Sequence, residues 1–101
     1  MGQKLNSEIT HHDEKMKAIY EARLPGFYID ARGAYGIVIG RLYICCSINL
    51  EDGAYDVTVD TVDKNGDFAL NIDWESYTDP KEAIHRLRYK VQYFAKRPST
   101  W

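Results

Sequence analysis

Three two-residue turn signals divide the middle of the chain into short segments, and they constrain the fold more than any other feature. Gly40-Arg41, Asp52-Gly53 and Asn65-Gly66 each separate segments that are rich in β-branched and apolar residues. Such dipeptides favour tight hairpins whose twist matches that of the flanking strands. We therefore predict four antiparallel strands in meander order, over about residues 34–39, 42–50, 55–62 and 67–75.

A two-residue turn also fixes the register of its hairpin, and a slip of one residue would invert both faces of a strand. We take Gly40-Arg41 as a type II′ turn and the other two as type I′ turns. The apolar pairs expected on one face are Ile39–Leu42, Ile37–Ile44, Tyr35–Cys46, Leu50–Tyr55, Ile48–Val57, Cys46–Val59, Thr61–Leu70, Val59–Ile72 and Val57–Trp74. The polar pairs expected on the other face are Asn49–Asp56, Ser47–Thr58, Cys45–Asp60, Asp60–Asn71, Thr58–Asp73 and Asp56–Glu75. All three turns place the apolar residues on the same face.

Two helices are expected to flank these strands. The first spans about residues 8–23, with an apolar stripe at Met16, Ile19 and Tyr20, and the sequence LPG at 24–26 ends it. The second starts at an Asp79 cap, has Pro80 in its first turn and runs to about residue 96. Its expected apolar stripe, which would cover the apolar face of the sheet, consists of Ile84, Leu87, Val91 and Phe94.

The fold class predicted is therefore α+β, in two layers: a four-stranded antiparallel meander with the C-terminal helix on one face and an N-terminal helix. Residues 27–31 are a candidate fifth strand at the edge. A chain of 101 residues, 45% of them hydrophobic, suits one domain over residues 1–101 with one modest core. We expect residues 1–6 and 98–101 to be flexible ends.

The location expected for the chain is cytoplasmic. No apolar run approaches the length of a membrane span, and the N-terminal residues contain no apolar segment typical of a secretory signal. Cys45 and Cys46 are adjacent, so on a strand they point to opposite faces and do not form an ordinary disulfide. Reduced thiols suit a reducing compartment.

Charge is strongly segregated along the chain. Residues 51–79 contain nine acids and one base, Lys64, whereas residues 80–101 contain six bases and one acid, Glu82. Aspartate is a poor strand residue, and Asp56 opposite Glu75 would be a like-charge pair that costs stability. We interpret these acids as a surface that binds the basic surface of a larger, nucleic-acid-binding protein, since spaced carboxylates can imitate phosphates. The partner-binding residues predicted are Asn49, Glu51, Asp52, Asp56, Thr58, Asp60, Asp63, Asp67, Asn71, Asp73 and Glu75.

Catalytic and metal sites are not expected. Asp56 and Glu75 resemble a carboxylate dyad in spacing, but an open sheet provides neither a cleft nor water exclusion. The sequence HHDE at 11–14 lacks the HExxH spacing of a zinc site, and DKNGD at 63–67 lacks the length of an EF-hand loop. We therefore predict a non-enzymatic protein without a cofactor. A homodimer is left open.

The second helix suggests an alternative function. Basic and aromatic residues follow one another at i, i+3, i+4, i+7 and i+11, a pattern that can hold nucleic acid. The residues of this alternative nucleic-acid-binding stripe are Arg86, Tyr89, Lys90, Tyr93 and Arg97.

The order helix–meander–helix resembles the double-stranded RNA-binding domain in outline. The sequence DPKEAIHRLRYK at 79–90 departs from the basic, alanine-rich signature of that domain's last helix, so no residue role is carried over. In size, charge and layout the chain resembles the small acidic inhibitors that phages encode, anti-CRISPR proteins among them. That resemblance implies an anti-defence accessory protein that inhibits a nucleic-acid-handling target.

Overall fold

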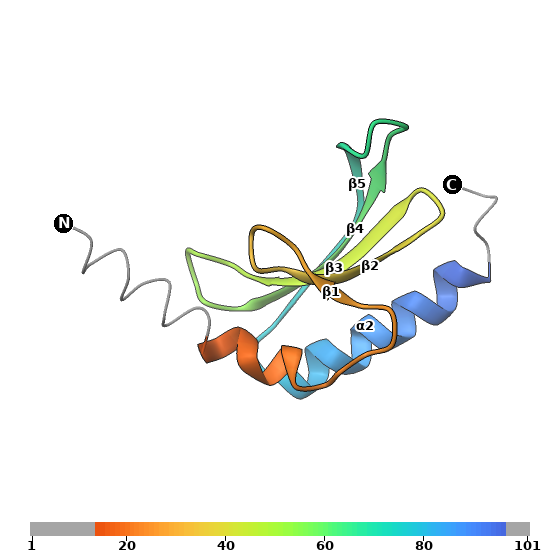
Figure 1. Ribbon diagram of the computed structural model, residues 1–101. Coiled ribbons are helices and arrows are strands. Elements are labelled where there is room, and N and C mark those ends of the chain that lie inside the picture. Colours follow the sequence, from red (N-terminus) through yellow and green to blue (C-terminus); the bar gives the residue numbers. More distant parts are fainter. Residues whose placement is uncertain (1–13, 97–101) are drawn as a thin grey trace.

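The computed structural model describes residues 14–96 and shows an α+β domain built on one antiparallel sheet. Helical residues 14–20 and α2 (Pro80–Ala95) lie on the same side of that sheet (Figure 1). The strands, in their order across the sheet, are β1 (Tyr28–Ile29), β2 (Tyr35–Ile39), β3 (Leu42–Ile48), β4 (Tyr55–Val62) and β5 (Phe68–Tyr77). The two-layer meander is confirmed, and the candidate fifth strand is present as β1.

Some of the expectations fall outside the described residues. These are the flexible ends at 1–6 and 98–101, and residues 8–13 of the first helix. Within the described part, the first helix ends at residue 20, earlier than the expected residue 23. After the helix, Ala22 N donates a hydrogen bond to Ile19 O and Arg23 N donates one to Tyr20 O. Arg23 adopts the left-handed conformation, with φ +49°. That conformation ends the helix before the sequence LPG.

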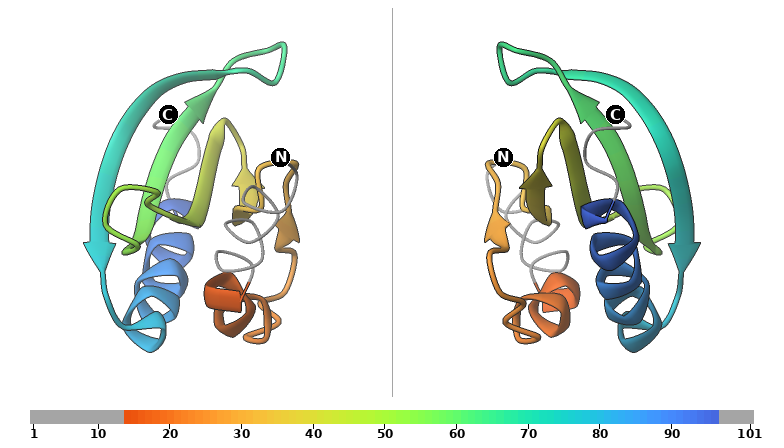
Figure 2. Two further views of the ribbon diagram at one scale, coloured as in Figure 1. Left: turned by 90° about the vertical axis from the view of Figure 1, so that its left-hand side faces the viewer. Right: turned by 90° about the vertical axis from the view of Figure 1, so that its right-hand side faces the viewer.

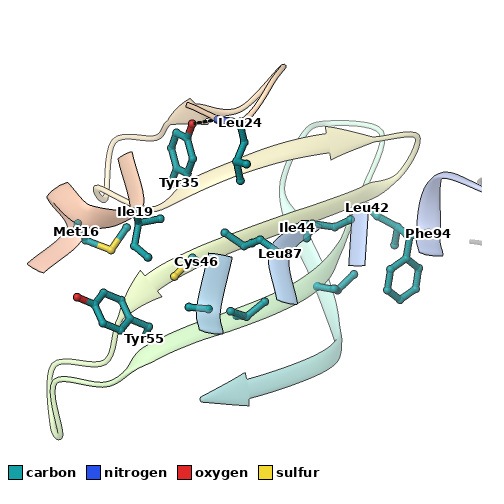
Figure 3. Packing of buried hydrophobic residues seen from close by; sticks show 13 residues of the cluster. Met16, Ile19, Leu24, Tyr35, Leu42, Ile44, Cys46, Tyr55, Leu87 and Phe94 are labelled. Carbon is teal, nitrogen blue, oxygen red and sulfur yellow. Dashed lines mark hydrogen bonds between the residues drawn. The ribbon is translucent and has the colours of Figure 1, made fainter. Parts of the chain in front are cut away.

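The core lies between one face of the sheet and the two helices (Figure 3). Met16 and Ile19 of the first helix pack there together with Leu87 and Phe94 of α2. The start of α2 is as expected, since Asp79 Oδ1 accepts a hydrogen bond from Lys81 N at 3.0 Å. The buried stripe of α2 differs from the expected one and consists of Ala83, Leu87, Lys90 and Phe94. Ile84 and Val91 are only half-buried, so the helix is rotated toward the row that contains Lys90.

The β2–β3 hairpin has the register that its turn dictates. Ile39 pairs with Leu42 and Ile37 pairs with Ile44, as predicted. Gly40 has φ +59°, and no positive φ is found at Arg41, which fits a type II′ turn.

The β3–β4 hairpin keeps its predicted faces but not its predicted register. Cys46 pairs with Val57 rather than Val59, a slip of two residues that preserves the sidedness of both strands. The loop is longer than a two-residue turn because Asn49 N donates to Ala54 O at 2.8 Å and Gly53 N donates to Asn49 O at 2.8 Å. Asn49 Oδ1 also accepts from Glu51 N at 2.8 Å, which holds the loop in this shape.

The β4–β5 hairpin departs furthest from prediction. Gly66 N donates to Asp63 O at 3.0 Å and Gly66 has φ +85°, so the loop is a type I turn followed by a left-handed glycine. Two β-bulges then shift the register of β5 by one residue each. Thr61–Leu70 and Asp60–Asn71 pair as predicted, because the first bulge compensates for the different turn. Beyond the second bulge the predicted pairs are wrong, and the observed ones are Val59–Asp73, Thr58–Trp74, Val57–Glu75 and Asp56–Ser76.

Candidate functional site

The sheet face away from the helices carries only part of the predicted acidic surface. Asp56 and Asp60 lie there on β4, on the same side as Thr58. The exposed acids of the adjoining loops extend this row at both ends: Glu51 and Asp52 in the β3–β4 loop, and Asp63 and Asp67 in the β4–β5 turn. We call these six carboxylates the β4 acidic row.

Neutral donors hold the two central carboxylates of this row. Asp56 accepts hydrogen bonds from Ser76 Oγ at 2.5 Å and from Asn49 Nδ2 at 3.2 Å. Asn71 Nδ2 donates to Asp60 Oδ1 at 2.8 Å. Within residues 14–96, no salt bridge joins any member of the row to a cation. These hydrogen bonds therefore fix the orientation of the two carboxylate groups without neutralising their negative charge.

The predicted placement of Asp73 and Glu75 on this open face is wrong. The second bulge puts Ile72 and Asp73 together opposite Val59, and the two side chains of a bulge point to roughly the same side. Asp73 and Glu75 consequently face α2, while Trp74 moves to the open face. The expected like-charge pair of Asp56 and Glu75 does not form, because Ser76 takes the position opposite Asp56.

Asp73 and Glu75 form an ion cluster with α2. Lys90 Nζ contacts Asp73 Oδ2 and lies 3.3 Å from Glu75 Oε2. Arg86 donates to both oxygens of Glu75, at 3.1 Å from Nε and 3.2 Å from Nη2. Tyr77 OH also donates to Glu75, at 2.6 Å. Two acids and two bases thus balance one another, which is how a protein tolerates a lysine that is only 3% exposed.

A groove of about 400 Å³ runs between β5 and α2, directly over this ion cluster. Tyr89 and Tyr93 stack on its helix side with ring centroids 6.2 Å apart, and the guanidinium of Arg86 lies 4.5 Å from the centroid of the Tyr89 ring. The residues that line the groove are Ile72, Asp73, Glu75, Arg86, Tyr89, Lys90, Tyr93 and Phe94.

The alternative nucleic-acid-binding stripe is altered by the same contacts. Lys90 is buried and Arg86 is paired, so neither presents a free cation to a phosphate. Tyr89 and Tyr93 are exposed by 48% and 42%, as a stacking surface requires. Arg97 lies outside the described residues. The stripe retains its aromatic part while two of its cations are engaged within the protein.

The hydrogen bonds and charges of the ion cluster give stability a specific pH dependence. Hydrogen bonds from Arg86 and Tyr77 and the positive charge of Lys90 lower the pKa of Glu75 from its ordinary 4.5 to about 2. A carboxyl whose pKa is lowered by folding stabilises the protein above the unfolded-state pKa, and this contribution is lost as the pH falls through the folded-state pKa. The stabilisation should therefore be complete above about pH 5 and disappear between about pH 4.5 and 2.

Glu75→Gln tests this expectation. Chemical unfolding of the wild type and the variant should show a difference in free energy that is largest near neutral pH and shrinks on acidification through that interval. Other carboxylates titrate in both proteins, so the difference isolates Glu75. A difference that stays constant from pH 6 to pH 2 would mean that Glu75 does not titrate as part of this cluster.

The open face also holds an aromatic cluster that the sequence interpretation missed. Tyr43 stacks between Tyr28 and Phe68, with ring centroids at 6.0 and 5.4 Å. Arg32 lies 4.9 Å from the centroid of the Phe68 ring, and Asp30 accepts hydrogen bonds from Arg32 and from Tyr43 OH. The signal was present in the sequence as Tyr43 at an outward position of β3. Its partners come from β1 and from beyond the β4–β5 turn, and no local pattern links them.

Gly36 makes room for this cluster. A Cβ built on Gly36 would lie 2.6 Å from both Cys45 Cβ and Ile44 O and 2.7 Å from Tyr43 Cε1. The ring of Tyr43 therefore lies close against a strand position that only glycine can occupy without displacing its neighbours. This packing buries Tyr43 to 2% exposure on a face that was expected to be polar.

The two thiols are free and buried on opposite faces, as the adjacent strand positions dictate. Burial raises the pKa of Cys46 to about 12 and also raises that of Cys45. Neither sulfur is therefore a reactive thiolate near neutral pH.

Comparisons of the chain with models of protein families, with curated proteins and with solved structures find no match. Among the described residues, no helix is both long and apolar enough to cross a membrane.

Proposed function

We propose that this chain is a non-enzymatic interaction module that occupies a basic surface of a larger, nucleic-acid-handling protein. The observation that supports the proposal best is the β4 acidic row, six carboxylates of which none is ion-paired within residues 14–96. Unpaired charge of one sign attracts a surface of the opposite sign and accelerates association with it. The two acids of β5, Asp73 and Glu75, are excluded from this surface by their pairing with α2.

Exposed aromatic residues beside the row supply apolar contact area. Trp74 is 60% exposed and pairs with Thr58, so it lies between the positions of Asp56 and Asp60 on the open face. Phe68, 52% exposed, lies nearer the β4–β5 turn. Interfaces combine a few aromatic anchors with a polar rim, and the acidic row with Trp74 has that composition.

An enzymatic role is less favoured by the geometry. The carboxylates that line the groove are bound to cations, and a Glu75 pKa of about 2 makes that group a poor proton acceptor at neutral pH. The proposal extends to a cytoplasmic location and to the class of phage-encoded, anti-CRISPR-like inhibitors, which the chain resembles in size, charge and layout.

Charge reversal tests the acidic row. Asp56→Lys with Asp60→Lys places two cations on the open face without touching the ion cluster, so the domain should remain folded. The matched control is Arg88→Glu with Lys96→Glu, which reverses one exposed cation of α2 and the exposed cation that follows its last residue. Tagged proteins should be used to capture partners from lysate of the host, and the affinity for the captured protein should then be measured at several salt concentrations.

The expected partner is basic, binds nucleic acid and is displaced from this chain by added duplex DNA or RNA. The Asp56→Lys/Asp60→Lys protein should bind it at least about tenfold more weakly, mainly through a slower association rate. The Arg88→Glu/Lys96→Glu protein should bind it within about twofold of the wild type. Normal binding by the Asp56→Lys/Asp60→Lys protein would contradict the proposal, because the partner would then not contact the β4 acidic row. Direct binding of the wild type to nucleic acid with a steep salt dependence would favour the alternative function, in which α2 contacts nucleic acid.

A further inference from the structure

The sheet ends in two very different edges. At one end, β1 contains two residues, too few to pair with another strand over any length. At the other end, β5 contains ten residues and pairs only with β4 among the described elements. Figure 2 shows β5 running along the outside of the molecule, with α2 beside its lower end. The outward backbone groups of such a strand form a template for another strand.

The β5 edge lacks most of the devices that keep a monomer's edge from pairing. Its sequence, FALNIDWESY, contains no lysine, arginine or proline. The two bulges distort only the part nearer the turn, so Asp73–Tyr77 pairs with β4 in regular register. The acids that could repel a second strand, Asp73 and Glu75, are neutralised by Lys90 and Arg86. The segment Asp73–Tyr77 therefore presents a regular strand edge on which the negative charges are balanced by Lys90 and Arg86.

Exposed apolar side chains gather at this edge in both layers of the fold. On β5, Leu70 and Trp74 are 63% and 60% exposed. On α2, Tyr89 and Tyr93 lie on the far side of the groove that separates the helix from β5. An occupant that covers both layers needs a strand for the β5 edge and apolar side chains for the helix side of the groove.

We propose that a second copy of this chain pairs with the β5 edge, in antiparallel orientation about a two-fold axis. An edge strand is its own hydrogen-bonding complement under such an axis, and an isologous interface brings the same patch from each copy. The second copy supplies β5 to extend the sheet and α2 to cover the exposed ring of Tyr89. An extended foreign peptide would satisfy the strand edge but would leave the helix side of the groove uncovered. The interface is formed by β5 and α2, whereas the β4 acidic row lies on β4 and its adjoining loops, so the dimer would carry two such rows, with Trp74 at the border of both surfaces.

The mass in solution tests this proposal. Sedimentation equilibrium of the full chain across micromolar concentrations should give the mass of two chains. Trp74→Lys with Tyr89→Lys places one cation in each layer of the edge, and the two-fold axis would bring these cations together. That protein should have the mass of one chain and remain folded. The matched control is Val38→Lys with Leu50→Lys, which changes two exposed apolar residues away from this edge and should remain dimeric.

Cross-linking then locates the axis. The native thiols are buried, so a cysteine introduced on β5 reports the interface alone. Oxidation should form a disulfide between the introduced cysteines of two Trp74→Cys chains, or of two Ser76→Cys chains, faster than between two Phe68→Cys chains. The reason is that the two-fold axis would pass through the regular segment of β5. Two results of the mass measurement would overturn the proposal. One is a wild type that has the mass of one chain up to several hundred micromolar, and the other is a Trp74→Lys/Tyr89→Lys protein that is still dimeric. The mass and the cross-linking rate are both measured on this chain alone, so they test the dimer without any partner, even though Trp74 borders the β4 acidic row and Ser76 Oγ donates to Asp56.

Discussion

Leu87→Ala is expected to lower the free energy of unfolding by about 3 kcal/mol, within the range typical of buried large-to-small changes. The side chain of Leu87 is completely buried in the core between α2 and the sheet (Figure 3). Truncation removes apolar contacts and leaves a cavity that the surrounding strands can close only in part. Denaturant titration should show a lower midpoint with an unchanged slope.

Two further variants calibrate that result. Arg88→Ala changes the neighbouring exposed residue and should stay within about 0.5 kcal/mol of the wild type. Ile72→Ala should cost less than Leu87→Ala, because Ile72 is only half-buried at the second bulge of β5. If Leu87→Ala were as stable as Arg88→Ala, α2 would not pack on the sheet as described.

Lys90→Met should cost about 2 kcal/mol at neutral pH, for an electrostatic reason rather than a packing one. Breaking a fully buried ion pair costs about 3–5 kcal/mol, and the effect is smaller here because Asp73 and Glu75 remain about one-third exposed to water. Methionine nearly preserves the shape of the buried side chain while removing its charge. Thermal or denaturant unfolding at constant salt concentration measures the loss.

A double variant separates the charge effect from any packing defect. Lys90→Met combined with Asp73→Asn removes the ammonium together with its nearest carboxylate, so part of the lost stability should return. No recovery would indicate that methionine itself fits poorly at this position. A Lys90→Met protein that is at least as stable as the wild type would show that the ion cluster contributes nothing net to folding.

The sequence determines the element order and most of the sidedness of this sheet. Gly40-Arg41 fixes its hairpin completely, because a two-residue turn leaves only one register. Even the β3–β4 hairpin, whose loop is longer than expected, keeps its faces because a slip of two residues preserves the alternation. Strand alternation is local information, and hydrophobic burial enforces it.

The tertiary structure decides which charges remain available to a partner. A β-bulge adds one residue to a strand and requires no particular residue type. The alternation of apolar and polar residues in β5 therefore does not indicate that Ile72 and Asp73 share a face. That single residue moves Asp73 and Glu75 from the open sheet to the ion cluster and moves Trp74 outward. The burial of Lys90 on α2 depends on these two carboxylates, which β5 places beside its ammonium group. The periodicity of α2 alone cannot indicate such a partner, since the free energy of burying a charge depends on what lies opposite it in space.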